Sequence, residues 1–308
     1  PAPARPRPPW LPPQPRPGVF AVRYGLQKRG ISMELIKGIS KETQGNCTLY
    51  HITSLTDEIK EELRRFLVAI CYGEEKASWG IDAYSYQNTL EAVLLRCSQQ
   101  GKTPSEERIK GMVGELLAHL LFRIEGDFHI ASAFFNLEEK SFKKGFDIIL
   151  LDTTNNTIWI TEIKSGEKHA DAKNVSDAIK DLINEAKLDL KKRLNNDNIV
   201  LWDNAINAAR NAMIDSTDEK KAVVDILKGY INKAAKKEIR SSQENVILLG
   251  NLFHPLSELS SIDSLKEKHT EICDKKLFGN TIIIATQQET YNNIYNFLKS
   301  EAQSCQKN

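Results

Sequence analysis

The sequence predicts an α/β fold in which a mixed β-sheet is covered by helices on both faces. Apolar β-branched runs alternate along the chain with amphipathic helical segments, and two of these runs form a hairpin pattern. Several runs are apolar at every position, which indicates strands that are buried on both faces of the sheet. At 308 residues and 41% hydrophobic content, the chain can form one large or two modest domains.

The hairpin pattern occupies residues 145–166. Gly-Phe-Asp-Ile-Ile-Leu-Leu-Asp is followed by the polar turn Thr-Thr-Asn-Asn and then by Thr-Ile-Trp-Ile-Thr-Glu-Ile-Lys-Ser-Gly. If the turn is centred on its middle peptide bond, Asp147 lies opposite Glu162. Because side chains alternate between the two faces of a strand, Lys164 lies on the same face as Glu162. The pattern therefore predicts two carboxylates and an ammonium group at one end of the hairpin.

This set of groups suits a metal-dependent phosphodiesterase. Magnesium prefers oxygen ligands and usually takes one or two protein carboxylates, which leaves room for water and a substrate phosphate. Asp147 and Glu162 would supply carboxylate oxygens to Mg²⁺ or Mn²⁺, and the main-chain carbonyl of Ile163 could supply another. Lys164 would orient or help to deprotonate the attacking water and offset charge in the transition state. The alternative is an ordinary solvated strand face, but charges seldom lie among runs this apolar without a purpose.

The order of three segments resembles a known superfamily. A predicted helix with Gly-Glu-Leu-Leu precedes Gly-Phe-Asp-Ile-Ile and then Thr-Glu-Ile-Lys-Ser-Gly, which looks like the PD-(D/E)xK, or restriction-endonuclease-like, nucleases. Within that superfamily the chain is similar to the HamA-type nuclease component of the Hachiman anti-phage defence system. The motifs lie in about residues 108–168, and a family-like layout extends from Met33 to the end. Phe146 stands in the place of the proline that names the superfamily.

The resemblance implies a three-layer restriction-endonuclease-like core and a magnesium-dependent nuclease that acts on DNA. By position, its catalytic residues fall on Asp147, Glu162 and Lys164, with Glu115 as an acid from the preceding helix that would add or orient a metal ligand. It also implies anti-phage defence and a HamB-like helicase partner that restrains the nuclease until foreign DNA is sensed. The alternatives are a stand-alone restriction-type or repair endonuclease and a catalytically inactive scaffold of nuclease descent.

Glu115 has two interpretations. Its helix is expected at residues 105–123, and Glu115 falls well away from the apolar stripe of that helix. This side could face solvent, which is ordinary for a helical glutamate. It could equally face the catalytic groove, because Gly111, Gly114 and Ala118 would let another backbone or a nucleic-acid strand approach closely.

Composition divides the chain into three parts. Residues 1–32 hold nine of the eleven prolines, six Lys or Arg residues and no acids, which indicates a disordered or polyproline-like tail. Met33 is the first methionine, so the native start could lie there. Without the six cations of the tail, the formal charge of +1 becomes −5, so a DNA-binding groove would have to be local. Residues 33–100 are expected to form an α+β accessory region that packs on the nuclease core or docks a partner, and residues 101–308 are expected to form that core.

The remaining elements follow from apolar periodicity and cap residues. Strands are expected at residues 33–39, 47–52, 245–253 and 281–285, and helices at 54–72, 86–98, 171–194, 202–213, 219–238, 261–276 and 289–303. Ser54 is the expected N-cap of the first helix. Four lysines on the polar side of helix 171–194 favour a solvated face over a phosphate-binding row: Lys173, Lys180, Lys187 and Lys191.

Several classes of protein are disfavoured. Five cysteines without Cys-x-x-Cys spacing argue against a zinc site and a disulfide framework, and so favour a cytoplasmic location. No apolar run is long enough to cross a bilayer, so no membrane partner is expected. The sequence has no Walker loop or Gly-x-Gly-x-x-Gly fingerprint. Energy-driven DNA processing would therefore have to come from another subunit.

Overall fold

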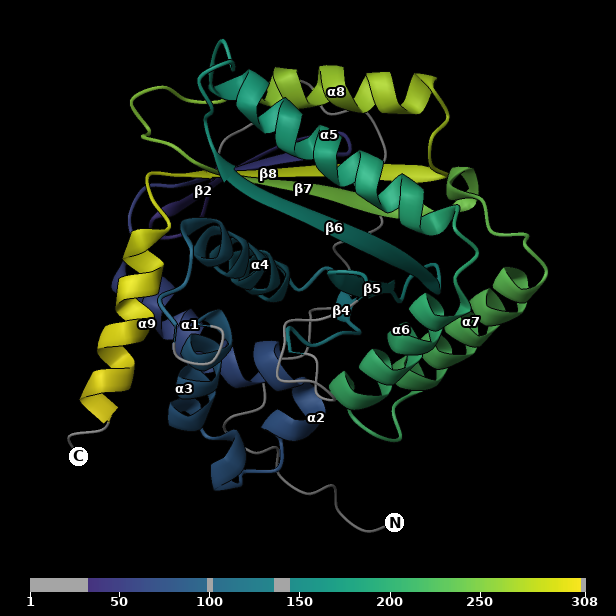
Figure 1. Ribbon diagram of the computed structural model, residues 1–308, viewed down its shortest axis with the longest axis horizontal. Helices are drawn as coiled ribbons and strands as arrows, with labels where there is room; N and C mark the ends of the chain where they lie inside the picture. The colour runs from purple at the N-terminus through teal and green to yellow at the C-terminus, as the bar shows by residue number, and fades with distance from the viewer. Residues whose placement is uncertain (1–32, 99–101, 136–144, 306–308) are drawn as a thin grey trace.

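A computed structural model describes residues 33–98, 102–135 and 145–305 of the chain. The predicted tail of residues 1–32 and the predicted domain boundary at residue 100 lie outside the described residues. Eight strands of the described part form one mixed sheet with helices on both faces (Figure 1). The predicted three-layer α/β architecture is thereby confirmed. None of the described helices is long and apolar enough to cross a membrane.

The sheet has a parallel centre and antiparallel edges. Its strand order is β1-β2-β3-β8-β7-β6-β5-β4. Strands β3, β8, β7 and β6 run parallel, whereas β1, β2, β5 and β4 pair antiparallel with their neighbours. The strands are β1 (Met33–Ile36), β2 (Ile39–Gln44), β3 (Cys47–Ile52), β4 (His129–Ile130), β5 (Ile148–Asp152), β6 (Thr157–Glu167), β7 (Asn245–Phe253) and β8 (Asn280–Gln288).

Two groups of helices bury the two faces of the sheet. Helices α1, α3, α4 and α9 form one apolar core with one face, and α5 and α8 form a second core with the other, which α6 and α7 extend beside β5 (Figure 1). The helices are α1 (Asp57–Tyr72), α2 (Glu74–Ala77), α3 (Tyr86–Cys97), α4 (Glu106–Glu125), α5 (Val175–Leu194), α6 (Ile199–Ala212), α7 (Asp218–Ala235), α8 (Ile262–Asp274) and α9 (Asn292–Cys305). Two short 3-10 helices are η2 (Asp82–Tyr84) and η3 (Ser241–Gln243).

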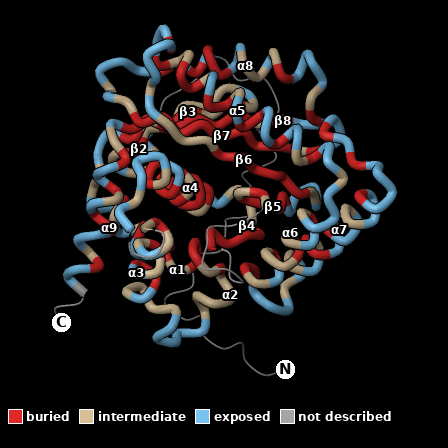
Figure 2. The backbone as a smooth tube through the Cα atoms, in the orientation of Figure 1, coloured by how far each residue is buried: buried red, intermediate tan, exposed pale blue. Residues whose placement is uncertain are grey.

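The β5–β6 hairpin has the register that the sequence predicts. Ile148 pairs with Thr161 and Asp152 with Thr157, so the turn is centred where expected. Every residue of β5 is buried, and β6 is buried over most of its length (Figure 2). The hairpin is therefore enclosed between the two helical layers, and any charged side chain on it must find a partner.

Residues 33–44 differ from the prediction, whereas the strand predicted at residues 47–52 is confirmed as β3. The strand expected at residues 33–39 is two strands, because the chain reverses at Gly38, whose φ of 90° favours glycine. Strand β3 then pairs with β8, so residues 33–52 extend the same sheet as the C-terminal part of the chain. The division into an accessory region and a core stays a prediction, since the sheet runs through both.

The N-cap of α1 is Thr56, not the predicted Ser54. The Thr56 hydroxyl accepts a hydrogen bond from the Ile59 amide at 3.3 Å, and so satisfies one of the free N–H groups of the first turn. Ser54 lies in the preceding turn, where its carbonyl accepts a hydrogen bond from the Thr56 amide.

The lysine row of α5 is not one solvated face. Helix α8 packs beside α5, and Lys180 pairs with Glu267 of α8 at 2.8 Å. Lys187 is buried and donates a hydrogen bond to Asn184. Both sequence interpretations of Lys187 were wrong, because a neighbouring helix that the periodicity of α5 cannot reveal covers this lysine.

Helix α4 lies close against the sheet at Gly114. A Cβ on Gly114 would lie 1.9 Å from Ser165 Oγ of β6 and 2.7 Å from Asn251 Nδ2 of β7. Those two side chains are hydrogen-bonded to each other at 3.2 Å, and Asn251 is fully buried. The glycine therefore sets the spacing between α4 and the strand that carries Glu162.

We expect Gly114→Ala to destabilise the protein by about 1–3 kcal/mol, because the new methyl group overpacks the contact between α4 and β6. Gly111→Ala on the same helix is the matched control, since nothing lies within 4 Å of its added Cβ. The control should be neutral or stabilising by about 0.5–1 kcal/mol. Urea unfolding of both variants measures the difference. Equal effects of the two substitutions would contradict the packing described here.

Candidate active site

The hairpin brings together three of the predicted site residues. Asp147 directly precedes β5, and its Oδ2 accepts a hydrogen bond from the main-chain N–H of Ile163 on β6 at 2.7 Å. Glu162 and Lys164 follow each other on one face of β6, with Lys164 Nζ 3.2 Å from Glu162 Oε1. Two acids and one amine therefore meet at the open end of the hairpin, as the sequence predicts.

Glu162 is the most enclosed member of this group. It is only 1% exposed, although it carries a carboxylate. Its Oε1 lies 2.7 Å from Arg193 NH2 and also receives the Lys164 ammonium. Its Oε2 has no hydrogen-bond partner among the described residues. A buried carboxylate oxygen without a partner costs free energy, so its presence points to a function.

The surroundings of Glu162 and Lys164 raise the pKa of both side chains. Burial and the nearby charge of Asp147 raise the pKa of Glu162 to about 8, because they outweigh Arg193 and Lys164. Burial opposes the charge on Lys164, but its hydrogen bond to Asp189 and the charge of Glu162 prevail and raise the Lys164 pKa. Lys164 is therefore a stable cation, which suits orienting water and offsetting charge better than accepting a proton.

Two residues of α5 complete the site, and the sequence analysis missed both. Asp189 Oδ2 lies 2.5 Å from Lys164 Nζ, and Arg193 contacts Glu162. The sequence does carry a signal for them. Leu182 and Ala186 belong to the buried stripe of α5, and seven residues later the same side of the helix carries Asp189 and Arg193. Charged residues that continue an apolar stripe indicate a buried polar partner on the opposing strand.

Glu115 lies on the other side of the sheet, near the Cys71 thiol of α1, whose pKa is raised by burial and further by the Glu115 charge. Glu115 is half-buried on α4, which packs on the β6 face that carries Ser165. Glu162 and Lys164 alternate onto the opposite face, against α5. The role of Glu115 as a ligand stays a prediction, and so does that of the Ile163 carbonyl.

The donor set fits a hard divalent cation. Glu162 Oε2 is a buried oxygen for which residues 33–98, 102–135 and 145–305 provide no hydrogen-bond partner, and Asp147 supplies a second carboxylate close enough to raise the Glu162 pKa. Across the described residues, no three His, Cys, Asp or Glu side chains lie close enough together to hold a metal. Two carboxylates are the number that magnesium commonly takes from a protein, with water and phosphate completing its coordination.

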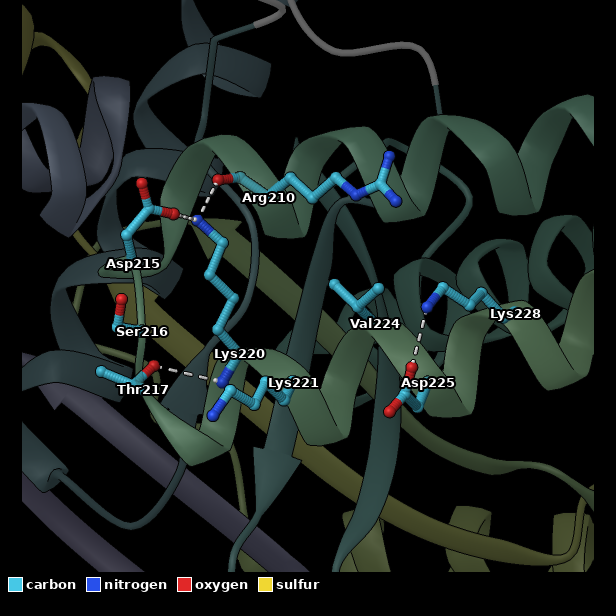
Figure 3. Close-up of a pocket in the computed structure, with 9 residues that line it drawn as sticks. All are labelled: Arg210, Asp215, Ser216, Thr217, Lys220, Lys221, Val224, Asp225 and Lys228. Atoms are coloured by element: carbon cyan, nitrogen blue, oxygen red, sulfur yellow. Dashed lines mark hydrogen bonds and ion pairs between the residues drawn. The ribbon is translucent and has the colours of Figure 1, made fainter.

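A surface pocket of about 440 Å³ lies elsewhere, between α6 and α7 (Figure 3). It contains none of the predicted site residues. Lys220 is already engaged there, because its ammonium contacts the Arg210 carbonyl, the Met213 carbonyl and Asp215. Lys228 likewise pairs with Asp225 at 2.9 Å. The Lys220 contacts tie the start of α7 to the end of α6, and the Lys228 pair lies within α7, so we assign the pocket no functional role.

In protein freed of divalent ions, we expect stability to fall as pH rises from about 5 to about 8. Because the folded-state pKa of Glu162 is raised from 4.5 to about 8, the folded protein binds more protons than the unfolded chain within this window. Glu162→Gln cannot titrate, so it removes this dependence. Urea unfolding in chelator at about pH 5 and about pH 8 measures this effect. Between the two, the free energy of unfolding of the wild type should fall by on the order of a few kcal/mol more than that of the variant.

The two proteins would instead lose stability in parallel if Arg193 and Lys164 kept Glu162 ionised throughout this range. Glu185→Gln, an exposed substitution on α5, is the control for a change of charge alone.

Comparison with known proteins identifies the family of the chain. The HamA family model matches residues 33–298, which include every element that forms the site. No curated protein is similar enough to match the sequence. HamA proteins are a component of the Hachiman anti-phage defence system. The match covers well over half of the chain, and this protein therefore belongs to the HamA family.

Proposed function

We propose that this protein is a Mg²⁺-dependent nuclease of anti-phage defence that hydrolyses phosphodiester bonds in DNA. The observation that carries the proposal is the buried Glu162 beside a second acid: one of its oxygens is held by cations, and the other has no hydrogen-bond partner in the part of the chain that the structure describes. Burying such a group without a ligand is costly. A divalent ion that bridges the site to a phosphate would use the free oxygen.

In this proposal Asp147 and Glu162 hold the metal. The Ile163 carbonyl and Glu115 are further candidate ligands from the sequence. A bound Mg²⁺, or Mn²⁺ in its place, would lower the pKa of water and stabilise charge on the phosphate oxygens. The hydrogen bond from the Ile163 amide fixes Asp147 Oδ2 against β6, so the two acids are held in a constant relation before substrate arrives.

Lys164 supplies positive charge at the reacting phosphate. Its ammonium is partly exposed, with 24% of the side chain accessible, whereas Glu162 behind it is buried. The raised Lys164 pKa keeps the group protonated. It would therefore orient the attacking water and offset charge that develops in the transition state, and the hydroxide would not be generated by this amine.

The proposed substrate is DNA, and the proposed partner is a HamB-like helicase. The formal charge of −5 beyond the tail gives no global attraction to nucleic acid, so binding would rely on local cations or on the partner. The sequence also has no nucleotide-binding loop of its own. A helicase partner that opens DNA and admits it to the hairpin site would supply both the attraction to nucleic acid and the nucleotide-driven step.

A non-catalytic scaffold is the rival function, and one observation favours it. Arg193 and Lys164 already compensate Glu162, so the site is stable as an ion-pair network without further groups. A scaffold of this kind would act independently of divalent ions. A stand-alone endonuclease would depend on them but not on a helicase.

Cleavage of plasmid and linear DNA by the purified protein, with and without the product of the neighbouring gene, separates these possibilities. We expect Mg²⁺-dependent cutting that chelator abolishes. Glu162→Ala and Lys164→Ala should each slow it by roughly 10²–10³-fold, since each removes a group that stabilises the transition state. Phage protection in cells should be lost in parallel.

Lys192→Ala is the matched control for the lysine, because Lys192 is exposed on α5 beside the site residues. It should cut and protect like the wild type. Protection that survives Glu162→Ala and Lys164→Ala would support the scaffold. Cutting that needs no second protein would support the stand-alone enzyme.

A further inference from the structure

We propose that Arg193 is a positioning residue that sets the metal affinity of the site by holding both carboxylate-bearing segments with a single guanidinium. This inference rests on the proposed metal-dependent function, and it goes beyond the residues that the Glu-x-Lys pattern provides. Its basis is a set of contacts between α5 and the hairpin.

Arg193 bridges strand β6 and the segment that leads into β5. Its NH2 group donates to Glu162 Oε1 at 2.7 Å, and its NH1 group donates to the Gly145 carbonyl at 2.5 Å. Gly145 lies two residues before Asp147, at the start of the segment that delivers the second acid. One planar fork therefore fixes the distance between the Asp147 segment and Glu162, a geometry that a lysine ammonium cannot reproduce.

Gly145, whose carbonyl accepts the hydrogen bond from Arg193, has an unusual backbone conformation. Its φ is 151°, a conformation that L-residues rarely adopt, and nothing lies within 4 Å of an added Cβ. The backbone conformation therefore favours glycine here, although there is room for a side chain. The resulting backbone presents the carbonyl to Arg193.

The contact also selects which Glu162 oxygen is free. Oε1 receives both Arg193 and Lys164, and Oε2 receives no partner among the described residues. A group that hydrogen-bonds to the other oxygen of a metal-binding carboxylate orients that carboxylate. Loss of such a group typically weakens metal binding by about 10–100-fold. One turn earlier on α5, Asp189 holds Lys164 at 2.5 Å in the same manner.

Arg193 is not needed to anchor the helix itself. Helix α5 is fixed by its apolar stripe, which includes Ile183, Ala186, Leu190 and Leu194, all nearly or fully buried. About a third of the Arg193 side chain is accessible, at 32%. Arg193→Lys keeps a positive charge beside the buried Glu162, so it removes the planar fork without leaving a buried charge unpaired. Loss of the bridge should therefore act locally, on the site.

Calorimetric titration of the full chain with Mn²⁺, without DNA, tests the inference. We expect Arg193→Lys to weaken Mn²⁺ binding roughly 10-fold or more while its thermal unfolding stays close to that of the wild type. Gly145→Ala perturbs the other end of the bridge without changing charge, and it should weaken binding similarly. If both act through one bridge, the double variant should lose little more than either single variant. Lys192→Gln, the neighbouring exposed cation, should bind as the wild type does.

The possible results are distinguishable. A wild type that binds no Mn²⁺ would overturn the proposed nuclease function itself. A wild type that binds, together with an Arg193→Lys variant of equal affinity, would overturn only the positioning role. If Arg193→Lys binds normally and Arg193→Gln does not, charge alone matters and the bridge is refuted. Tighter binding by Arg193→Lys would show instead that the guanidinium competes with the metal.

Discussion

The site is organised around the free-energy cost of burying the Glu162 carboxylate between the sheet and α5. Strand β6 is covered by α4 on one face and by α5 on the other, so Glu162 has almost no access to water. Two cations meet one of its oxygens, and the other oxygen is left without a partner among the described residues. The two cations hold this buried carboxylate in place, and removing either of them would leave its charge less compensated.

The fold positions this group by simple geometric rules. The hairpin register sets Asp147 against the end of β6, and the alternation of side chains turns Glu162 and Lys164 toward α5. Helix α5 begins at the Asn174 cap and runs back across β6 and β7, so its last two turns reach the open end of the hairpin (Figure 1). On the other face, Gly114 lets α4 approach β6 within direct contact of Ser165. The site is therefore rigid on both sides, which suits preorganised chemistry.

The sequence predicted the hairpin well because the relevant information is local. A polar four-residue turn between apolar runs fixes the register, and the register fixes the relation between Asp147 and Glu162. The three-layer architecture followed in the same way from strands that are apolar on both faces. Gly38 was missed as a reversal because a single glycine in a strand pattern is also compatible with a continuous strand.

The remaining features depend on contacts between distant elements. Lys187 is buried only because α8 packs against α5, which no periodicity within α5 reveals. Asp189 and Arg193 do continue the apolar stripe, but charges near a helix end are usually solvated, so their partners are visible only in three dimensions. Which face of the sheet the Glu115 helix covers could not be read from the sequence either, because that depends on how α4 packs on β6.

Anomalous diffraction from crystals grown with Mn²⁺ would show whether one metal ion is bound by both acids. We expect an anomalous peak at about 2–2.5 Å from carboxylate oxygens of both Asp147 and Glu162, with Arg193 still hydrogen-bonded to Glu162 Oε1. A map with no peak there, or with the ion bound away from Glu162, would contradict this expectation.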